Sequence, residues 1–372
     1  MKKILALGWA AALLLGSLTP AGAGPTAGGF ASDNIEYVRH LPFDLGTATG
    51  ARLIGKFLYV TSWRNFSIYD VSDPLNPALL STTPFGFAFE NEDVATDGNI
   101  LLFSESLPRN ILHIWNVEDK TNPVKITELA GAGDHTMSCI LKCRYAYGSD
   151  GTIVDLRDPT EPKFIAKRSD PNSWHKQTGL LGDAHDVEEF KNGFVITSPI
   201  SDALQLLDVR DPAHPKVLAR GPHPAPGNWL FHSGKWPRLG KDDFIVMEGE
   251  GTNGPILTYD ARNWQKDKTF ELIDQYTVPS GMYVDGRARS NGESSHWFDT
   301  HPKWNNGGLI AAGWYSHGMR LLQVKDTGKI KEVGYFLPYA GSTFAAYWVT
   351  PEVIYNVDLN RGVEILRYTG KF

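Results

Sequence analysis

The feature that most constrains the fold is a strand-and-turn unit that recurs along the chain. Four copies are IYDVSDPLNP from Ile68, IWNVEDKTNP from Ile114, IVDLRDPTEP from Ile153 and LLDVRDPAHP from Leu206. In each copy an apolar strand end leads into D-P-x-x-P or a close relative. Asp suits the first position of a type I turn, and Pro suits the second because its φ is already fixed. The unit therefore predicts a strand, a tight turn and a new extended segment.

Weaker copies of the unit continue to the end of the chain as TYDARNWQKD, LLQVKDTGKI and VEILRYTGKF. A second apolar strand precedes each copy, as in KFLYVTS, GFVITS and EVIYNVD. A period of roughly 40–50 residues with only strands inside each unit is typical of a propeller blade. The equivalent positions of the seven units are Asp70, Asn116, Asp155, Asp208, Asp260, Gln323 and Arg367.

These seven units predict an all-β fold, a seven-bladed β-propeller that occupies residues 34–372 as one domain. The segment NIEYVRHLPF from Asn34 is similar to the outermost strand that follows each turn, and the chain ends just after the third strand of the last blade. We therefore expect the N-terminal strand to pair with the C-terminal blade and close the ring. Closure removes exposed sheet edges.

The units IYDVSDPLNPALL, IVDLRDPTEPKFI and LLDVRDPAHPKVL resemble those of the LVIVD-repeat proteins. The resemblance covers nearly all of the mature chain, although the units at Asp260, Gln323 and Arg367 depart from the D-P-x-x-P pattern. It implies an exported bacterial β-propeller, and it implies the fold more than an activity. Because one fold carries many functions, function has to be argued from the site.

The N-terminus has the pattern of a secretory signal peptide. Lys2 and Lys3 precede an apolar stretch from Ile4 to Leu18, and Ala21-Gly22-Ala23 is a small-residue cleavage site. We assign residues 1–23 to the signal and residues 24–33 to a flexible lead; the alternative is a single membrane anchor. No later run of about 18 apolar residues follows, so no transmembrane segment is expected in the mature chain. The protein is expected to be secreted or periplasmic.

The charge pattern argues against a nucleic-acid partner. The formal net charge is −6, and acidic and basic residues are interspersed without a basic stripe. A lone G-x-G-x-x-G runs from Gly249 to Gly254, but Pro255 follows it and no helix is predicted there. It is therefore not a nucleotide site, and no nucleotide cofactor is expected.

The two cysteines of the chain, Cys139 and Cys143, flank a short turn. In an oxidising compartment such a pair suits a local disulfide across a hairpin. Alternatively, the two thiols and His135 could place three metal ligands on one helical face. The strand-like sequence RYAYGSDGTIVDL that follows favours the disulfide.

Four consecutive blades have a histidine at the predicted start of their innermost strand. His135, His185, His232 and His301 lie 20 to 28 residues before the unit position of their blade. Innermost strands surround the propeller axis, so these imidazoles should converge. The longest predicted loops open on the same face, which is typical of a binding face. Converging imidazoles favour iron, copper or zinc over calcium or magnesium.

Further side chains are expected around this cluster. Asp134, Asp183 and Asp186 could orient the imidazoles through their second N–H, and Glu92 and His317 are candidates for a catalytic base. The rim of the pocket is predicted to contain Trp63, Arg64, Trp229, Trp236, Glu248, Glu250, Trp297 and Trp304.

The histidine pattern leaves three interpretations. The rings could bind a transition metal, serve as acids and bases in a metal-free pocket, or simply cap turns and bridge blades. The first predicts a metal-dependent enzyme for oxidation, or for hydrolysis, lyase or isomerase chemistry, on a small organic molecule in the central channel. The alternative function is a non-catalytic surface module that binds protein or polysaccharide. Only the enzyme requires the rings to converge.

Overall fold

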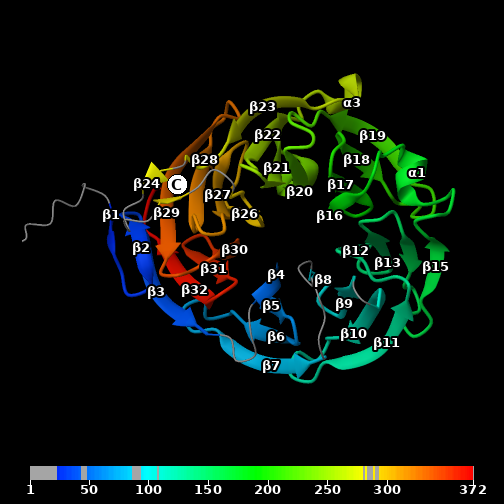
Figure 1. Cartoon of the computed structure of the whole chain (residues 1–372), viewed down its shortest axis with the longest axis horizontal. Helices are drawn as coiled ribbons and strands as arrows, with labels where there is room; N and C mark the ends of the chain where they lie inside the picture. Colours follow the sequence, from blue (N-terminus) through cyan, green and yellow to red (C-terminus); the bar gives the residue numbers. More distant parts are fainter. Residues whose placement is uncertain are drawn as a thin grey trace, which may run out of the picture.

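The computed structural model describes residues 23–42, 48–85, 94–106, 109–279, 281–282, 288–289 and 293–371. The strands form seven antiparallel blades around a central axis (Figure 1), which confirms the predicted fold. Blade 1 contains β4 (Ala48–Ile54), β5 (Phe57–Ser62), β6 (Asn65–Asp70) and β7 (Ala78–Pro84), and blade 2 contains β8 (Ala95–Thr96), β9 (Ile100–Glu105), β10 (Ile111–Asn116) and β11 (Val124–Ala130).

The next three blades repeat this arrangement, with the first strand innermost and the fourth outermost. Blade 3 contains β12 (Met137–Ile140), β13 (Tyr145–Gly148), β14 (Ile153–Asp155) and β15 (Lys163–Ala166). Blade 4 contains β16 (Ala184–Lys191), β17 (Phe194–Pro199), β18 (Leu204–Asp208) and β19 (Lys216–Gly221), and blade 5 contains β20 (Trp229–Lys235), β21 (Phe244–Gly251), β22 (Ile256–Asp260) and β23 (Glu271–Tyr276).

The last two blades are completed by the N-terminal residues. Blade 7 contains β30 (Thr343–Thr350), β31 (Val353–Asp358) and β32 (Gly362–Tyr368), and β3 (Ile35–Leu41) pairs with β32 as its outermost strand. Blade 6 contains β26 (Phe298–Thr300), β27 (Gly308–Gly313), β28 (Met319–Val324) and β29 (Ile330–Pro338). β2 (Gly29–Ser32) pairs with β29, and β1 (Ala23–Pro25) pairs with β2.

Residues 24–33, predicted as a flexible lead, thus include β2 and most of β1 in the structure. The backbone groups at the outer edge of β29 have no partner within blade 6 itself, and β2 supplies one. The sequence around β2 is rich in Gly and Ala, so it carries no strand pattern of its own.

The repeated turn owes its shape to the aspartate that defines it. Asp70 Oδ1 accepts the backbone N–H of Ser72 at 2.8 Å, and Asp155 accepts that of Arg157 at 3.0 Å. The hydrogen bonds from Ser72 lower the pKa of Asp70 to about 2. All seven unit positions lie on the third strand of a blade. The repeat in the sequence therefore corresponds to the repeat of blades in the structure.

Three innermost strands contain a β-bulge that could not be predicted from the sequence. β16 has a bulge at His185, between Ala184 and Asp186, and β20 has one at His232, between Phe231 and Ser233. β30 has the same feature at Phe344. A bulge inserts one extra residue and turns its side chain away from the regular alternation. The side chains of His185 and His232 therefore do not follow the regular alternation between the two faces of the sheet.

Helices are short in the described part of the chain. They are α1 (Trp174–Thr178), α2 (Pro237–Gly240) and α3 (Trp264–Asp267), and a small hairpin pairs β24 (Gly281–Met282) with β25 (Ala288–Arg289). Within the residues that the structure describes, no helix has the length and apolar character needed to cross a membrane.

Candidate metal centre

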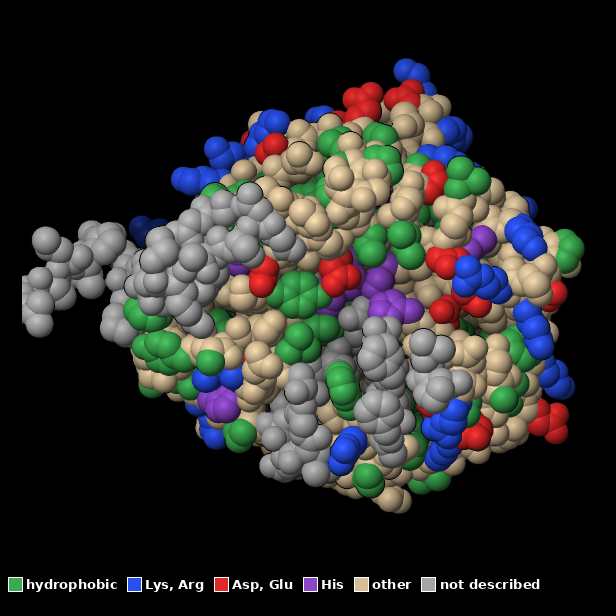
Figure 2. Space-filling model, viewed as in Figure 1, with side chains coloured by type: hydrophobic (Ala, Val, Ile, Leu, Met, Phe, Trp, Pro, Cys, Tyr) green, Lys and Arg blue, Asp and Glu red, His purple; other side chains and the backbone are tan. Residues whose placement is uncertain are grey.

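His185 and His232 form the middle of a histidine cluster at the propeller axis. Their ring centroids are 3.8 Å apart, and the exposed fractions of the two residues are 3% and 0%. The Nδ1 atom of His185 lies 3.1 Å from the backbone oxygen of His232. In the space-filling view, histidine side chains gather at the centre of the ring with acidic side chains beside them (Figure 2).

His135 joins this pair from the neighbouring blade. It lies just before β12, and its Nε2 atom is 2.8 Å from the Nε2 atom of His185. Zinc–nitrogen bonds of about 2.0–2.1 Å place two ligand nitrogens on one ion about 3 Å apart. The spacing of these two nitrogens is therefore close to that of a shared ion.

Glu250 connects the cluster to a further histidine, His296. One carboxylate oxygen of Glu250 lies 4.0 Å from His232 Nε2, and the other lies 3.9 Å from His296 Nε2. The hydroxyl of Tyr315 donates a hydrogen bond to Glu250 and fixes its carboxylate. One ligand atom each from His185, His232 and Glu250 fall within 4.8 Å of one another.

The second ring nitrogen of each histidine shows which tautomer the site favours. His185 Nδ1 faces a carbonyl oxygen, and His296 Nδ1 lies 3.0 Å from the backbone oxygen of Phe344. His232 Nδ1 lies 2.8 Å from Glu248, a carboxylate with 0% exposure. For His185 and His296, the carbonyl acceptor opposite Nδ1 favours the proton there and leaves the lone pair on Nε2, as in metal-binding histidines.

Trp297 forms the floor of the cluster. Its indole lies 4.9 Å from the His232 ring and 6.4 Å from the His185 ring, in edge-on contacts. The residue is buried and follows His296 directly. An apolar floor lowers the local dielectric and strengthens any interaction between the cluster and a charged ligand.

The structure places His301, predicted as a metal ligand, outside the cluster. Its Nε2 atom lies 3.0 Å from the backbone oxygen of Pro351, and its Nδ1 atom accepts the N–H of Lys303 at 3.1 Å. The reason is register, because His301 follows the end of β26. The histidines of the cluster lie either before their innermost strand or at a bulge within it.

His296 occupies the position that was assigned to His301. A signal for it existed in the sequence. His296 lies 27 residues before Gln323, close to the 28 residues that separate His232 from Asp260.

The three aspartates predicted to orient the imidazoles have other described partners. Asp134 accepts the backbone N–H groups of His135 and Asp150 at 2.8 and 2.7 Å, and burial raises its pKa to about 6. Asp183 binds Arg168 at 2.9 Å, and Asp186 accepts the hydroxyl of Ser138 at 2.9 Å. Among the described contacts, Glu248 and Glu250, predicted only for the rim, are the carboxylates that face the imidazoles.

Two of the predicted rim tryptophans, Trp236 and Trp304, lie at the opposite end of the innermost strands from the cluster. Trp236 follows β20 and donates its indole N–H to the backbone oxygen of Asp242 at 2.9 Å, and Trp304 packs into the core beside Phe298. Trp236 directly follows β20, whose first residue is Trp229.

The remaining rim and base candidates are dispersed. Trp229 is buried and stacks on His223 with ring centroids 4.2 Å apart, while Trp63 and Arg64 form the exposed turn between β5 and β6. His317 is buried in the turn after β27, where its backbone N–H binds the oxygen of Trp314 at 2.8 Å. Glu92 lies outside the described residues.

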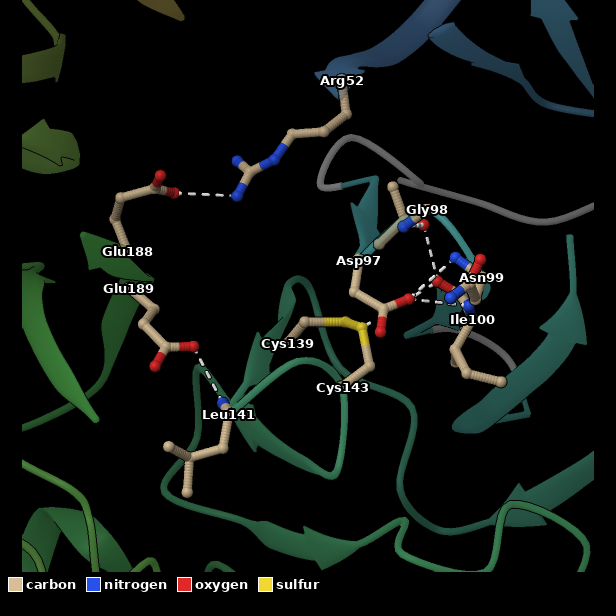
Figure 3. The surroundings of a disulfide bond; sticks show 11 residues. Arg52, Asp97, Gly98, Asn99, Ile100, Cys139, Leu141, Cys143, Glu188 and Glu189 are labelled. Atoms are coloured by element: carbon tan, nitrogen blue, oxygen red, sulfur yellow. Dashed lines mark hydrogen bonds and ion pairs between the residues drawn. A yellow bond between two sulfur atoms is a disulfide. The ribbon is translucent and has the colours of Figure 1, made fainter. Parts of the chain in front are cut away.

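The disulfide prediction is confirmed. Cys139 and Cys143 are joined across the turn between β12 and β13 (Figure 3), where Leu141, Lys142 and Cys143 have positive φ. The pair is on a hairpin rather than a helix, which removes the alternative of a helical metal site with His135.

Comparison with known proteins identifies the fold of the chain but does not identify an activity. The family model of the LVIVD repeat matches residues 45–83, and no curated protein matches the chain. Three solved structures are similar to most of the chain. The β-propeller domain of Cps50 (Swd1) from Myceliophteria thermophila superposes with a TM-score of 0.61 at 12% identity, over 90% of this chain and 99% of that one.

U3-55K follows with a TM-score of 0.59 at 10% identity, over 90% and 98% of the two chains. The WD40 repeats of RRP9 give 0.58 at 10% identity, over 92% and 98%. Identities this low show the fold alone. The chain is thus a seven-bladed β-propeller with one matched LVIVD repeat in its first blade.

Proposed function

We propose that the axial cluster binds one transition-metal ion and is the active centre for chemistry on a small organic molecule. The observation that carries the proposal is the convergence of His185, His232 and Glu250, whose ligand atoms lie within 4.8 Å of one another. His135 and His296 flank this group at 2.8 Å and 3.9 Å from one of its members. Such convergence is not needed for structural histidines, which bind backbone groups separately, as His301 does.

The types of ligand atom in the cluster limit which metal ions it would bind. Two imidazoles and one carboxylate form the ligand set of non-haem iron oxygenases and also of zinc hydrolases, and both leave positions for substrate and water. A bound ion of this kind supplies either redox chemistry or an activated water. Iron, copper and zinc are therefore the candidates, and oxidation or metal-assisted hydrolysis, lyase or isomerase chemistry is the corresponding reaction class.

The chain's own residues have distinct roles in this proposal. The bulge carbonyls lie opposite Nδ1 of His185 and His296, and Glu248 lies 2.8 Å from Nδ1 of His232. His185, His232 and Glu250 then present their ligand atoms within 4.8 Å of one another. Tyr315 holds Glu250 in place. The buried indole of Trp297 covers one side of the His185 and His232 rings. We further propose that the protein works outside the cytoplasm, on the basis of the signal-like sequence of residues 1–23.

Elemental analysis of the purified mature protein tests the proposal. We expect near-stoichiometric iron, copper or zinc, and its loss in a His185→Ala, His232→Ala double variant. His301→Ala is the matched control, because this histidine is also buried and binds backbone groups. The control should retain the metal.

The result that contradicts the proposal is equally clear. If the folded wild-type protein holds none of the three metals after reconstitution, the metal centre is excluded. The face would then be better explained as a metal-free pocket or as a surface that binds protein or polysaccharide. Circular dichroism of each variant establishes that loss of metal is not loss of fold.

A further inference from the structure

A separate cavity lies in the central channel next to the histidine cluster. Its volume is about 330 Å³, within the range of small-ligand sites. Asp186, Ser233 and Trp297 line it, and each directly follows a histidine of the cluster in the sequence. The cavity therefore begins one residue further along the same innermost strands. Trp297 contacts the imidazole rings and also lines the cavity, so it lies between the two.

The cavity continues toward the face opposite the histidine cluster. Its lining includes Leu53 and Ile54 at the end of β4, Phe298 in β26, Tyr347 in β30, and Cys139 of the disulfide hairpin. Aromatic and aliphatic side chains thus form much of its wall. Figure 3 shows the hairpin end of this region, where Arg52 and Glu188 point toward each other from β4 and β16.

Half of the charged residues of the lining are paired with one another. Arg52 binds Glu188 at 3.0 Å, and Lys235 binds Asp299 at 2.8 Å. These two pairs cancel their charges. They leave Asp97, Asp186, Glu189 and Lys142 as the remaining charged residues of the lining.

Two of the three remaining carboxylates are satisfied by the backbone. Asp97 Oδ1 accepts the N–H groups of Asn99 and Ile100, each at 2.8 Å. Glu189 accepts those of Leu141 at 2.8 Å and Gly193 at 2.6 Å. Their role is to shape the turns at this end of the channel.

Asp186 is different. It is only 2% exposed, and its Oδ1 atom accepts the Ser138 hydroxyl at 2.9 Å and the backbone N–H of Val187 at 2.7 Å. Its Oδ2 atom has no hydrogen-bond partner among the described residues. A buried carboxylate oxygen without a partner is costly, and a cationic donor in the adjoining cavity would remove that cost.

We propose that this cavity binds a small organic ammonium ion, whose N–H donates to Asp186 Oδ2. The carbon part of the ligand packs on the aromatic wall, where Trp297 and Tyr347 add cation–π attraction. A calcium ion requires six to eight oxygen ligands. One carboxylate oxygen is too few for that, whereas it suffices for an ammonium group. The site needs no metal and is independent of the proposed metal centre.

Calorimetric titration tests the proposal with n-butylammonium chloride and with n-butanol, its neutral counterpart of similar size. The protein is first freed of metal with a chelator, so that failure of the metal proposal does not affect the result. We expect saturable binding of butylammonium and no comparable binding of butanol. Asp186→Asn should weaken butylammonium binding about tenfold or more, because it removes the charge-assisted hydrogen bond.

Glu189→Gln is the matched control, because Glu189 lines the same cavity but has its oxygens occupied by backbone N–H groups. It should bind butylammonium as the wild type does. Equal affinity for butanol and butylammonium, no binding of either, or unchanged affinity in Asp186→Asn would each overturn the proposal.

A second measurement is needed in case Asp186→Asn does not fold. Butylammonium should change the tryptophan fluorescence of the wild type. Trp297→Phe should abolish that change and weaken binding, because the indole supplies part of the cation–π attraction. A fluorescence change that persists in Trp297→Phe would place the ligand elsewhere and overturn the proposal.

Discussion

At the residue scale, the site depends on what lies behind each imidazole as much as on the imidazole itself. Glu248 is fully buried, and the hydroxyls of Ser233 and Ser295 donate to it at 3.2 and 3.1 Å. Its Oε2 atom lies 2.8 Å from His232 Nδ1, so its charge faces that side of the ring. A carboxylate in this position fixes the ring and increases its basicity toward a metal.

Replacing Glu248 with Gln is expected to lower metal affinity roughly 10–100-fold, the usual effect of losing a partner of a ligand histidine. The amide is a weaker acceptor and does not hold the Nδ1 proton as firmly. Competition with a metallochromic chelator measures the change. Glu271→Gln, on the exposed outer strand β23, should leave the affinity unchanged. Equal affinities in the two variants would show that Glu248 does not orient a ligand.

At the element scale, the hairpin of β12 and β13 is held at its turn by the disulfide. The bridge spans only four positions in sequence, and Glu189 of β16 accepts the N–H of Leu141 in the same turn. The covalent bond and the neighbouring blade thus hold one conformation together. A bridge that closes so short a loop constrains the unfolded chain only modestly.

Removing the bridge with Cys139→Ser and Cys143→Ser is therefore expected to lower the free energy of unfolding by about 2 kcal/mol, the loop-entropy value for so short a loop. Metal content should not change, because neither thiol belongs to the axial cluster. Urea unfolding and elemental analysis check the two statements. Loss of metal in this variant would indicate that the cysteines are metal ligands, and it would contradict the assignment of the metal site to the axial cluster.

At the scale of the whole molecule, the ring is closed by non-local pairing. β3 pairs with β32 from Ile35 opposite Tyr368 to Leu41 opposite Val363, so an N-terminal strand completes the C-terminal blade. β1 and β2 extend the adjacent blade in the same way. Without β3, the edge of β32 would be left open to pairing with another molecule.

Two truncations separate these contributions. Removal of residues 23–41 deletes all three strands, and we expect loss of several kcal/mol of stability and formation of oligomers through the open edge of β32. Removal of residues 23–32 deletes only β1 and β2 and should leave a monomer with a modestly lower melting temperature. Light scattering after size exclusion distinguishes the two. A monomeric, equally stable protein after the longer truncation would contradict ring closure by β3.

Three histidines of the candidate site could be predicted from the sequence, and the misplaced fourth histidine has an identifiable cause. His135, His185 and His232 were found because their distance from the repeated turn is nearly regular. The distance from the repeated turn also predicts His301, whereas His296 is the histidine that lies at the axis, because SSHWFDTHP does not mark the boundary of β26. Strand boundaries near the axis depend on packing between blades, which a local pattern does not contain.

The sequence by itself determined the number of blades, the position of each repeated turn and the closing strand, because turn chemistry and strand patterning act between neighbouring residues. Only the tertiary structure decided which side chains meet at the axis. Bulges at His185 and His232 redirect those rings, Glu250 and Tyr315 arrive from two different blades, and Asp186 is left facing a cavity. Those contacts join residues tens of positions apart, and they exist only once the ring has closed.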